Sequence, residues 1–479
     1  MSLITLFIVL AAASLLSYLP LRQNGFLRVL AVFVAGVELA AAYRVLASVF
    51  ASGTYAWQGY LAVDAVGAVL VLMLALVGSA VGVYSVGYLG AEMRKGIIGP
   101  RRVRQYFALL YLFLLAMFFA VSTTSPILAW IAIEATTLST AFLISFYGKS
   151  SSLEAAWKYL MVNSIGLLSG MFGTILFLYP ALHAGAGLAS WAALAAAAPG
   201  FNPFVLKIAF VFVLVGYGTK VGLVPMHTWL PDAHSKAPAP VSALLSGVLL
   251  NVAFFLVLKY LGIIDAVVGP AFPHGLLIFF GLLSLAVAAL IIFVQKNYKR
   301  LLAYSSIEHM GITALGFGFG GIAAAAALLH MLYHSLAKSL LFLSAGNIFV
   351  KFSSTKIERV SGAITVLPVT GVLFMLGFLA ITGVPPFGTF ITEFSILAGG
   401  IAAHPYVVLA ALFALALVFI GFLKRVASMM FGDAPEGLQK GEAGIWTLAP
   451  AIGLAAVLCI LSVYLPFGLH ALLAAASSI

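Results

Sequence analysis

Ionisable side chains stand within several apolar runs of this sequence, where they could exchange protons. Glu134 lies well inside SPILAWIAIEATTLSTAFLISFYG, and Lys220 follows the apolar run FVLKIAFVFVL. Such a charge costs about 2.5–3.5 kcal/mol at the centre of a membrane helix. A protonated Glu134, or one paired with a cation on another helix, avoids much of that cost. We expect Lys220 to be that cation and the pair to exchange a proton when a neighbouring charge moves. A static ion pair is the alternative.

A second set of titratable groups follows one face of a predicted helix. His330, His334 and Lys338 in LLHMLYHSLAKSLLFLSAGNI stand at i, i+4 and i+8, so they share a stripe about 12 Å long. Histidine titrates near neutral pH, and the stripe predicts a proton wire along the membrane plane. Two histidines at this spacing could also ligate zinc, but no carboxylate or thiol accompanies them on that face.

Two apolar runs are interrupted next to such groups, one after Lys220 and one before Glu393. Both interruptions consist of glycine and proline: Gly222, Pro225, Gly383, Pro385 and Pro386. Proline removes a backbone hydrogen bond that lipid cannot replace. Two broken spans, each beside an ionisable residue, predict an inverted repeat with ion sites at the breaks. Separate proline kinks are the alternative.

The other charges within apolar runs have simpler interpretations. Arg44, Lys207 and Lys259 suit snorkelling near helix ends. Glu38 and Asp64 suit either hydrogen bonding between helices or a functional role.

The composition indicates that these apolar runs lie in a membrane. Of 479 residues, 64% are hydrophobic and only 8% are charged, against about 25% charged in soluble domains. The start, MSLITLFIVLAAASLL, lacks a basic region, so we expect a retained helix rather than a signal peptide. One cysteine, Cys459, permits neither an internal disulfide nor a four-thiolate cluster. Redox chemistry therefore belongs to a partner, and no cofactor is expected in this chain.

Apolar runs of roughly 20 residues predict 14 spans. They cover approximately 2–20, 26–49, 59–90, 105–122, 126–147, 154–180, 203–224, 238–262, 273–294, 300–316, 320–350, 362–400, 404–432 and 443–475. The odd-numbered connections hold 18 of the 24 lysines and arginines, beginning with Arg22, and the even-numbered ones hold none. The positive-inside rule then places both termini outside. The net charge of +11 reflects this topology and attraction to anionic lipid, and needs no nucleic acid.

Several long motifs resemble those of a known family. GTKVGLVPMHTWLPDAHSKAPAPVSALLSGVLL resembles the signature of the antiporter-like subunits shared by respiratory complex I, Mrp-type Na⁺/H⁺ antiporters and membrane-bound hydrogenases. The similarity continues through KNYKRLLAYSSIEHMG, HMLYHSLAKSLLF and GVPPFGTFITEF over roughly residues 100–400. IEATTLSTAFLISFYG, PAPVSALLSGVLLN and HSLAKSLLFLSAGN are most similar to the F-type subunit of hydrogenase 4 and related formate hydrogenlyases.

The resemblance implies an all-α polytopic membrane protein of about 14 helices with two inverted five-helix repeats. Helices 7 and 12 would be the broken ones. Its divisions would be residues 1–100 with helices 1–3, 101–264 with the first repeat (helices 4–8), 265–432 with the second (helices 9–13), and 433–479 with helix 14.

The resemblance also implies a proton relay. Its expected members are Glu134, Lys220, His234, Lys259, His330, His334, Lys338 and Glu393. His227 matches a family histidine near the link between helices 7 and 8, where a surface or gating role also fits. The sequence departs from many complex I relatives at Asn251, which replaces a lysine. Asparagine holds no proton charge, so we expect it to interrupt that step or to orient a water molecule.

These features predict a proton-translocating membrane subunit of a redox-driven complex. The chain would be a non-catalytic transport subunit in a prokaryotic plasma membrane, beside other membrane subunits, a [NiFe] hydrogenase and iron–sulfur proteins. An Mrp-type Na⁺/H⁺ antiporter subunit is the second hypothesis, although sodium prefers clustered oxygen ligands. A structural anchor without transport is the third, favoured by Asn251 and opposed by the buried charges.

Overall fold

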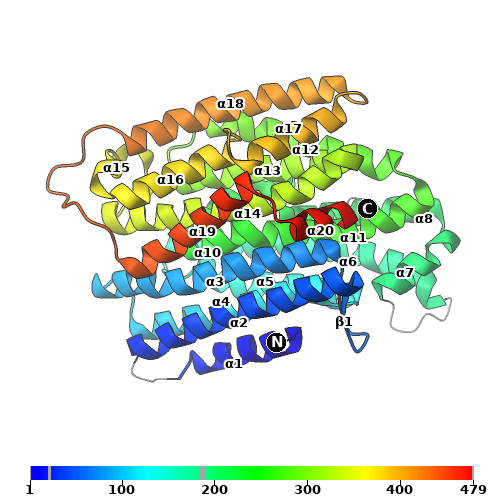
Figure 1. The fold of residues 1–479 in the computed structure, drawn as a ribbon, viewed down its shortest axis with the longest axis horizontal. Helices are drawn as coiled ribbons and strands as arrows, with labels where there is room; N and C mark the ends of the chain where they lie inside the picture. The colour runs from blue at the N-terminus through cyan, green and yellow to red at the C-terminus, as the bar shows by residue number, and fades with distance from the viewer. Residues whose placement is uncertain (1, 20–22, 184–189, 477–479) are drawn as a thin grey trace.

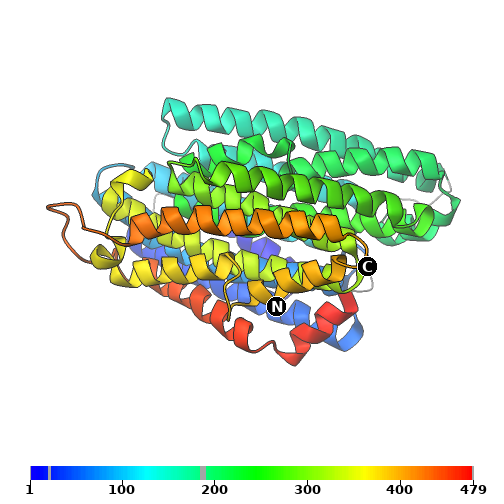
Figure 2. The same cartoon turned by 90° about the horizontal axis from the view of Figure 1, so that it is seen from above.

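The computed structural model describes residues 2–19, 23–183 and 190–476. Its helices lie side by side along the long axis of the molecule (Figures 1 and 2). Within the described residues, eleven helices are long and apolar enough to cross a membrane, and α1 and α16 are shorter apolar helices. The chain is thus a multi-pass, helical membrane protein. Arg22, the first of the basic loop residues, lies outside the described part.

The N-terminal quarter forms one side of the bundle and includes a small β-hairpin. Its helices are α1 (Leu3–Leu16), α2 (Gln23–Ser52), α3 (Ala65–Arg94) and α4 (Pro100–Ser122). The antiparallel strands β1 (Tyr55–Trp57) and β2 (Leu61–Val63) pair between α2 and α3. Gln58 and Gly59 both have positive φ angles, of 46° and 75°, as a tight hairpin turn requires. This hairpin departs from the purely helical expectation.

The next elements contain the first broken helix. They are α5 (Pro126–Ile144), α6 (Ser150–His183), α7 (Trp191–Ala197), η1 (Ala198–Gly200), α8 (Pro203–Val221), η2 (Met226–Thr228), α9 (Trp229–Lys236), α10 (Ala239–Leu244), η3 (Leu245–Leu249) and α11 (Leu250–Val268). The five residues of η3 form a π-helical turn between α10 and α11. Such turns often mark functional sites in helices.

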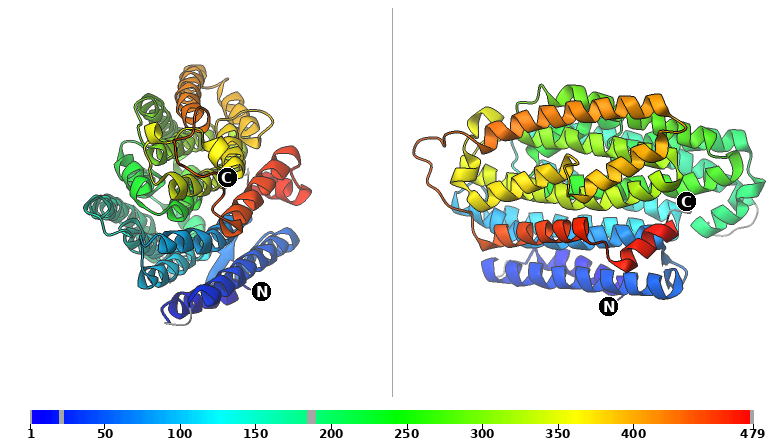
Figure 3. Two further views of the ribbon diagram at one scale, coloured as in Figure 1. Left: turned by 90° about the vertical axis from the view of Figure 1, so that its left-hand side faces the viewer. Right: turned by 45° about the horizontal axis from the view of Figure 1, so that its top comes forward.

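The remaining elements contain the second broken helix. They are α12 (Ala271–Ile292), α13 (Tyr298–Phe319), α14 (Gly321–Phe352), η4 (Ile357–Arg359), α15 (Ala363–Val366), α16 (Pro368–Ile381), α17 (Gly388–Gly400), α18 (Pro405–Met430), α19 (Ile445–Val463) and α20 (Phe467–Ala476). The end-on view shows α1 and α2 at one edge of the bundle and α18 at the other (Figure 3). Among the eleven candidate spans, the one formed by α10, η3 and α11 and the one formed by α14 are the most buried.

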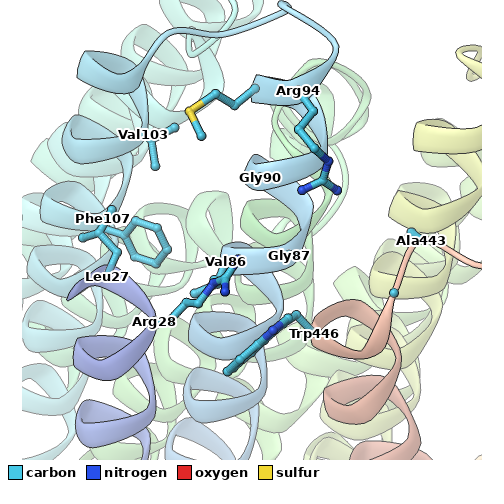
Figure 4. Close-up of a pocket in the computed structure, with 12 residues that line it drawn as sticks. Leu27, Arg28, Val86, Gly87, Gly90, Arg94, Val103, Phe107, Ala443 and Trp446 are labelled. Atoms are coloured by element: carbon cyan, nitrogen blue, oxygen red, sulfur yellow. The ribbon is translucent and has the colours of Figure 1, made fainter. Parts of the chain in front are cut away.

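The C-terminal helix α19 packs back against the N-terminal side, next to α3. At its start the Arg28 guanidinium lies over the Trp446 ring, 5.7 Å from its centroid. These two side chains line a cavity of about 160 Å³ that also receives Arg94 from the end of α3 (Figure 4). The contact fastens α19 to α2 at the end of the bundle that bears the basic loops.

Several expected spans have different limits in the structure. The span expected at 59–90 begins at Ala65, because Asp64 caps α3 by accepting a hydrogen bond from the Gly67 amide. The run 362–400 is divided among α15, α16 and α17, and the run 443–475 is divided between α19 and α20. Glycine and proline interrupt these runs, and apolar composition alone does not show such interruptions.

Candidate functional site

The first break places Lys220 at the end of a helix inside the bundle. Helix α8 stops at Val221, and Gly222 adopts a left-handed conformation with φ of 85°. A Cβ atom at Gly222 would lie 2.5 Å from Cδ1 of Leu230, so only glycine fits both the turn and the packing. The chain then continues through η2 into α9. Lys220 therefore sits in the last turn of α8, beside the interruption.

Lys220 is fully buried and bound by hydroxyl groups. Its Nζ donates to Thr137 Oγ1 at 2.9 Å and to the Tyr159 hydroxyl at 2.7 Å. The Tyr159 hydroxyl is also bonded to Thr140 Oγ1 at 2.5 Å. Helices α5, α6 and α8 thus meet at one ammonium group.

Glu134 lies on α5, one turn from Thr137, and does not form a direct ion pair with Lys220 in the structure. Ser164 Oγ donates to Glu134 Oε1 at 2.8 Å, and Glu134 Oε2 has no hydrogen-bond partner among the described residues. The two charges interact through space. In place of a direct ion pair, the Lys220 ammonium is bonded to the hydroxyls of Thr137 and Tyr159, and the Glu134 carboxyl to that of Ser164.

A second cluster surrounds Lys338 on α14. Lys338 Nζ donates to the Leu302 carbonyl oxygen at 3.0 Å, and Lys338 lies near enough to the Glu308 carboxyl on α13 for the two groups to interact electrostatically. Ser305 Oγ donates to Glu308 Oε2 at 3.3 Å. The same carboxylate oxygen lies 3.7 Å from His309 Nε2. Both Lys338 and Glu308 are buried, so the protein interior must supply their polar partners.

Histidines continue this cluster towards the second break. His309 Nδ1 and His330 Nε2 share a hydrogen bond of 2.9 Å, and His330 Nδ1 bonds to Thr392 Oγ1 at 2.9 Å. His309 Nδ1 also lies 4.0 Å from Glu393 Oε1. The His334 ring lies 5.4 Å from that of His309, centroid to centroid. The series from Glu308 through His309 to His330 and Glu393 is therefore continuous within contacts of 4.0 Å or less.

The second break positions Glu393. Helix α16 ends at Ile381, Gly383 has a φ of 63°, and α17 begins at Gly388 beyond the two prolines. A Cβ atom at Gly383 would lie 2.3 Å from Glu393 Oε2. The carboxyl group therefore packs directly against the interrupted backbone.

One part of this cluster has the donor atoms of a metal site. Single ligand atoms of His309, His330 and Glu393 lie within 4.8 Å of one another. Two imidazoles and a carboxylate suit zinc. Because His309 and His330 already bond to each other, a metal would have to separate their rings. As they lie, the two imidazoles share one hydrogen bond.

An apolar-walled cavity of about 320 Å³ adjoins the histidines. Thr392 and Ser395 line it from α17, together with His470 of α20 and Ile322 near the start of α14. The Thr392 hydroxyl thus touches both His330 and this cavity. The predicted connections at the end of the bundle opposite the basic loops contain no lysine or arginine. The cavity lies towards that end.

Two expected relay residues, His234 and Lys259, and the family histidine His227 lie outside the hydrogen bonds described above. His234 is buried on α9, its ring stacked 5.0 Å from that of Phe342, and neither ring nitrogen has a hydrogen-bond partner among the described residues. Lys259 forms an ion pair with Asp64 where both side chains are partly exposed. His227 faces the Tyr304 ring at 6.3 Å. Lys259 therefore lies at the partly exposed edge of the bundle, paired with Asp64.

Asn251 joins the π-helical turn to α14 by hydrogen bonds. Its Nδ2 lies 2.8 Å from Ser335 Oγ, 3.0 Å from the Gly247 carbonyl oxygen and 3.2 Å from that of Met331. Its Oδ1 has no partner among the described residues, which leaves one acceptor for a water molecule. Asn251 is therefore a neutral bridge between the π-helical turn and α14.

Sequence reasoning missed His309, Thr392 and Tyr159. His309 directly follows Glu308 in SSIEHMG, so the adjacent ionisable pair in an apolar helix was an available signal. Thr392 precedes Glu393 in the same way. Tyr159 offered no signal, because a tyrosine in a membrane helix is common and its role depends on three helices meeting.

A multi-pass bundle with two interrupted helices and buried ionisable side chains at both breaks defines an ion-transport class of membrane protein. The chain belongs to the NADH:quinone oxidoreductase/Mrp antiporter transmembrane family, whose model matches residues 123–419.

Individual relatives agree with this assignment. The chain is 38% identical over 381 residues to the hydrogenase-4 component F homolog of Methylacidiphilum infernorum, a match that covers 78% of this chain and 79% of that protein. A chain of the archaeal membrane-bound sulfane sulfur reductase superposes with a TM-score of 0.82 at 24% identity, covering 98% and 97% of the two chains. A chain of the Mrp complex from Dietzia sp. DQ12-45-1b gives 0.83 at 18% identity, covering 99% and 96%. These last two similarities, at less than 25% identity, show the fold alone.

Proposed function

We propose that this chain is the proton-translocating membrane subunit of a redox-driven complex of the hydrogenase 4 or formate hydrogenlyase kind. The observation that carries the proposal is the buried series Lys338, Glu308, His309, His330 and Glu393, joined by contacts of 4.0 Å or less from Glu308 onward. An anchor gains nothing from such groups, which are costly within a membrane. A second centre around Glu134 and Lys220 belongs to the same relay.

Proton movement in this relay is driven by charge. A carboxyl or ammonium group changes its proton affinity when a neighbouring charge appears or disappears. Protonation of Lys220 would change the proton affinity of Glu134. The Tyr159 hydroxyl bonds to both Lys220 Nζ and Thr140 Oγ1. In the second cluster, the Lys338 ammonium and the Glu308 carboxyl set the charge felt by the two bonded histidines. The chain supplies this series, and a partner supplies the driving electron transfer.

The proposal extends to partners, cofactors and location. We expect other membrane subunits, a [NiFe] hydrogenase and iron–sulfur proteins beside this chain, with all redox centres in those partners. The relative with 38% identity is a hydrogenase-4 component F homolog, which supports that choice. We further propose two inverted repeats, at 101–264 and 265–432, in a prokaryotic plasma membrane with both termini outside.

Copurification is the experiment that tests the proposal. A tag on this chain, mild detergent and mass spectrometry of the accompanying proteins should recover a [NiFe] catalytic subunit and iron–sulfur proteins. The purified complex in vesicles should then acidify or alkalinise the lumen when formate or hydrogen is supplied. Recovery of small membrane proteins alone, with Na⁺-dependent proton flux and no electron donor, would replace the proposal by a cation/proton antiporter.

A further inference from the structure

Two adjoining cavities open at the end of the bundle where the basic loops lie, away from both clusters described above. Their volumes are about 230 and 220 Å³. Tyr147, Lys149 and Phe349 line both cavities, so we describe them as one cytoplasmic basin. Its walls come from the ends of α3 and α14 and the starts of α6 and α13.

Several charged and hydroxyl side chains line the basin. Four lysines line it, Lys95 and Lys149 near its mouth and Lys236 and Lys299 on the side of α9 and α13, together with the hydroxyls of Ser151, Ser152 and Ser235. Polar walls of this kind hold water.

A buried carboxyl group stands in the wall of the basin. Glu92 is only 1% exposed; the Tyr147 hydroxyl donates to its Oε1 at 2.6 Å, and its Oε2 has no partner among the described residues. The Tyr147 hydroxyl also bonds to that of Tyr88 at 3.1 Å. A buried carboxylate oxygen without a protein partner requires water or a proton. Since Glu92 lines the basin, either can reach it.

Lys299 connects the basin to the interior. It is only 4% exposed, yet it lines the basin, and its Nζ donates to the Ala237 carbonyl between α9 and α10. An ammonium group has three donors, so others remain for water. Lys299 lies close enough to interact electrostatically with Glu92 on one side and with His234 on the other.

His234 completes the connection. It interacts with both Lys299 and Lys338, and both of its ring nitrogens are free of hydrogen bonds within the described residues. An imidazole with two free nitrogens can accept a proton at one and release it at the other.

We propose that the cytoplasmic basin is the proton entrance of this subunit, with Glu92 and Tyr147 collecting protons from water and Lys299 and His234 passing them to Lys338. The inference deepens the proposed function and rests on it. A purely structural ion pair that holds α3 to α13 would require neither a basin nor two free imidazole nitrogens.

Cysteine labelling tests the route. Cys459 is the sequence's one cysteine, so a Cys459→Ala parent permits single-site labelling. Ser235→Cys lies in the basin wall. Glu358→Cys is an exposed control at the same end, and Ala402→Cys is a control at the opposite end. Each is treated with a membrane-impermeant charged thiosulfonate in vesicles of both orientations that carry the whole complex.

We expect Ser235→Cys and Glu358→Cys to react from one side of the membrane and Ala402→Cys from the other. The label at Ser235→Cys should slow redox-driven pumping at least fivefold, reversibly with a thiol reductant, and the label at Glu358→Cys should leave it unchanged. Labelling of Ser235→Cys without any loss of pumping would overturn the entrance while leaving the proposed function intact. If the complex with the Cys459→Ala parent chain transfers electrons but does not pump protons, both the proposed function and the proposed entrance are overturned.

Substitution of the carboxyl group gives a second measurement. Glu92→Gln should slow pumping at least fivefold, and Glu92→Asp should restore part of the rate, because it keeps a titratable group. Glu154→Gln, at an exposed carboxyl of α6 near the same end, is the matched control and should pump normally. Equal rates for Glu92→Gln and Glu154→Gln would show that protons do not pass Glu92.

Discussion

His309 Nδ1 and His330 Nε2 face each other at 2.9 Å, and their rings stack with centroids 5.1 Å apart. A hydrogen bond between two imidazole nitrogens needs one donor and one acceptor, so one proton occupies the line between them. Transfer of that proton changes the tautomer or the charge of both rings at once. Glu308 lies beside one end of this pair, and the Thr392 hydroxyl lies at the other.

Breaking this pair should stop transport. We expect His309→Gln or His330→Gln to lower redox-driven pumping at least tenfold, because an amide cannot take up and release a proton. Dye quenching in vesicles measures the rate, and copurified partners report assembly. His404→Gln, at the exposed start of α18, is the control. Normal pumping by both pair variants would remove the histidines from the route.

The charged groups at the first interrupted helix should be equally essential for pumping. Glu134→Gln and Lys220→Ala should each abolish redox-linked pumping while largely sparing assembly, since both remove a charge that the other responds to. Tyr159→Phe should have a smaller effect, because Thr137 still accepts from Lys220. The same vesicle assay measures all three. Unchanged pumping in either charge variant would contradict the relay.

The Thr392 hydroxyl should govern release towards the cavity that it lines. Thr392→Val keeps the shape of the side chain and removes the oxygen bonded to His330. We expect pumping to slow several-fold with normal assembly. Thr382→Val, which removes a hydroxyl bonded to the Phe378 carbonyl in the same region, is a matched control. Equal rates in the two variants would place the exit elsewhere.

Gly383 should be costly to replace. With φ at 63° and Glu393 Oε2 only 2.3 Å from the place of a Cβ atom, Gly383→Ala should destabilise the protein by about 1–3 kcal/mol. It should also displace Glu393 and slow pumping. Thermal unfolding in detergent measures the first effect, with Gly453→Ala as a control at a helical glycine that has open space. Equal melting temperatures would contradict the packing.

Asp64 should contribute a pH-dependent share of stability. Burial alone raises the pKa of its carboxyl, but the charge and hydrogen bond of Lys259 and the Gly67 amide outweigh it and hold the pKa below the usual value. Such a carboxyl stabilises the fold above its ordinary pKa of about 4 and loses that effect as the pH falls through the lower folded value. The difference in melting temperature between wild type and Asp64→Asn should therefore shrink between pH 7 and pH 3. A constant difference would contradict this.

The sequence predicted the membrane class and family well, because apolar runs and long motifs are local properties. Glycine and proline likewise indicated both helix breaks. The contacts within the site were less accessible. Lys220 was expected to pair with Glu134, but its ammonium donates to Thr137, one turn along the same helix as Glu134, and to Tyr159 on α6. Lys259 was placed in the relay, but Asp64, far away in the chain, holds it near the surface. Such partners depend on the three-dimensional packing of helices.

Helix α19 also touches the second cluster. The Tyr333 hydroxyl, between His330 and His334 in the chain, donates to the Leu461 carbonyl at 2.7 Å, and the Gly388 amide donates to Ser462 Oγ at 3.1 Å. A ribosome makes the chain from its N-terminus, so Leu461 and Ser462 enter the membrane after every helix that carries a titratable group of the cluster. Until then Tyr333 and the start of α17 lack these partners. The order of synthesis therefore delays the two contacts that join α19 to α14 and to the start of α17.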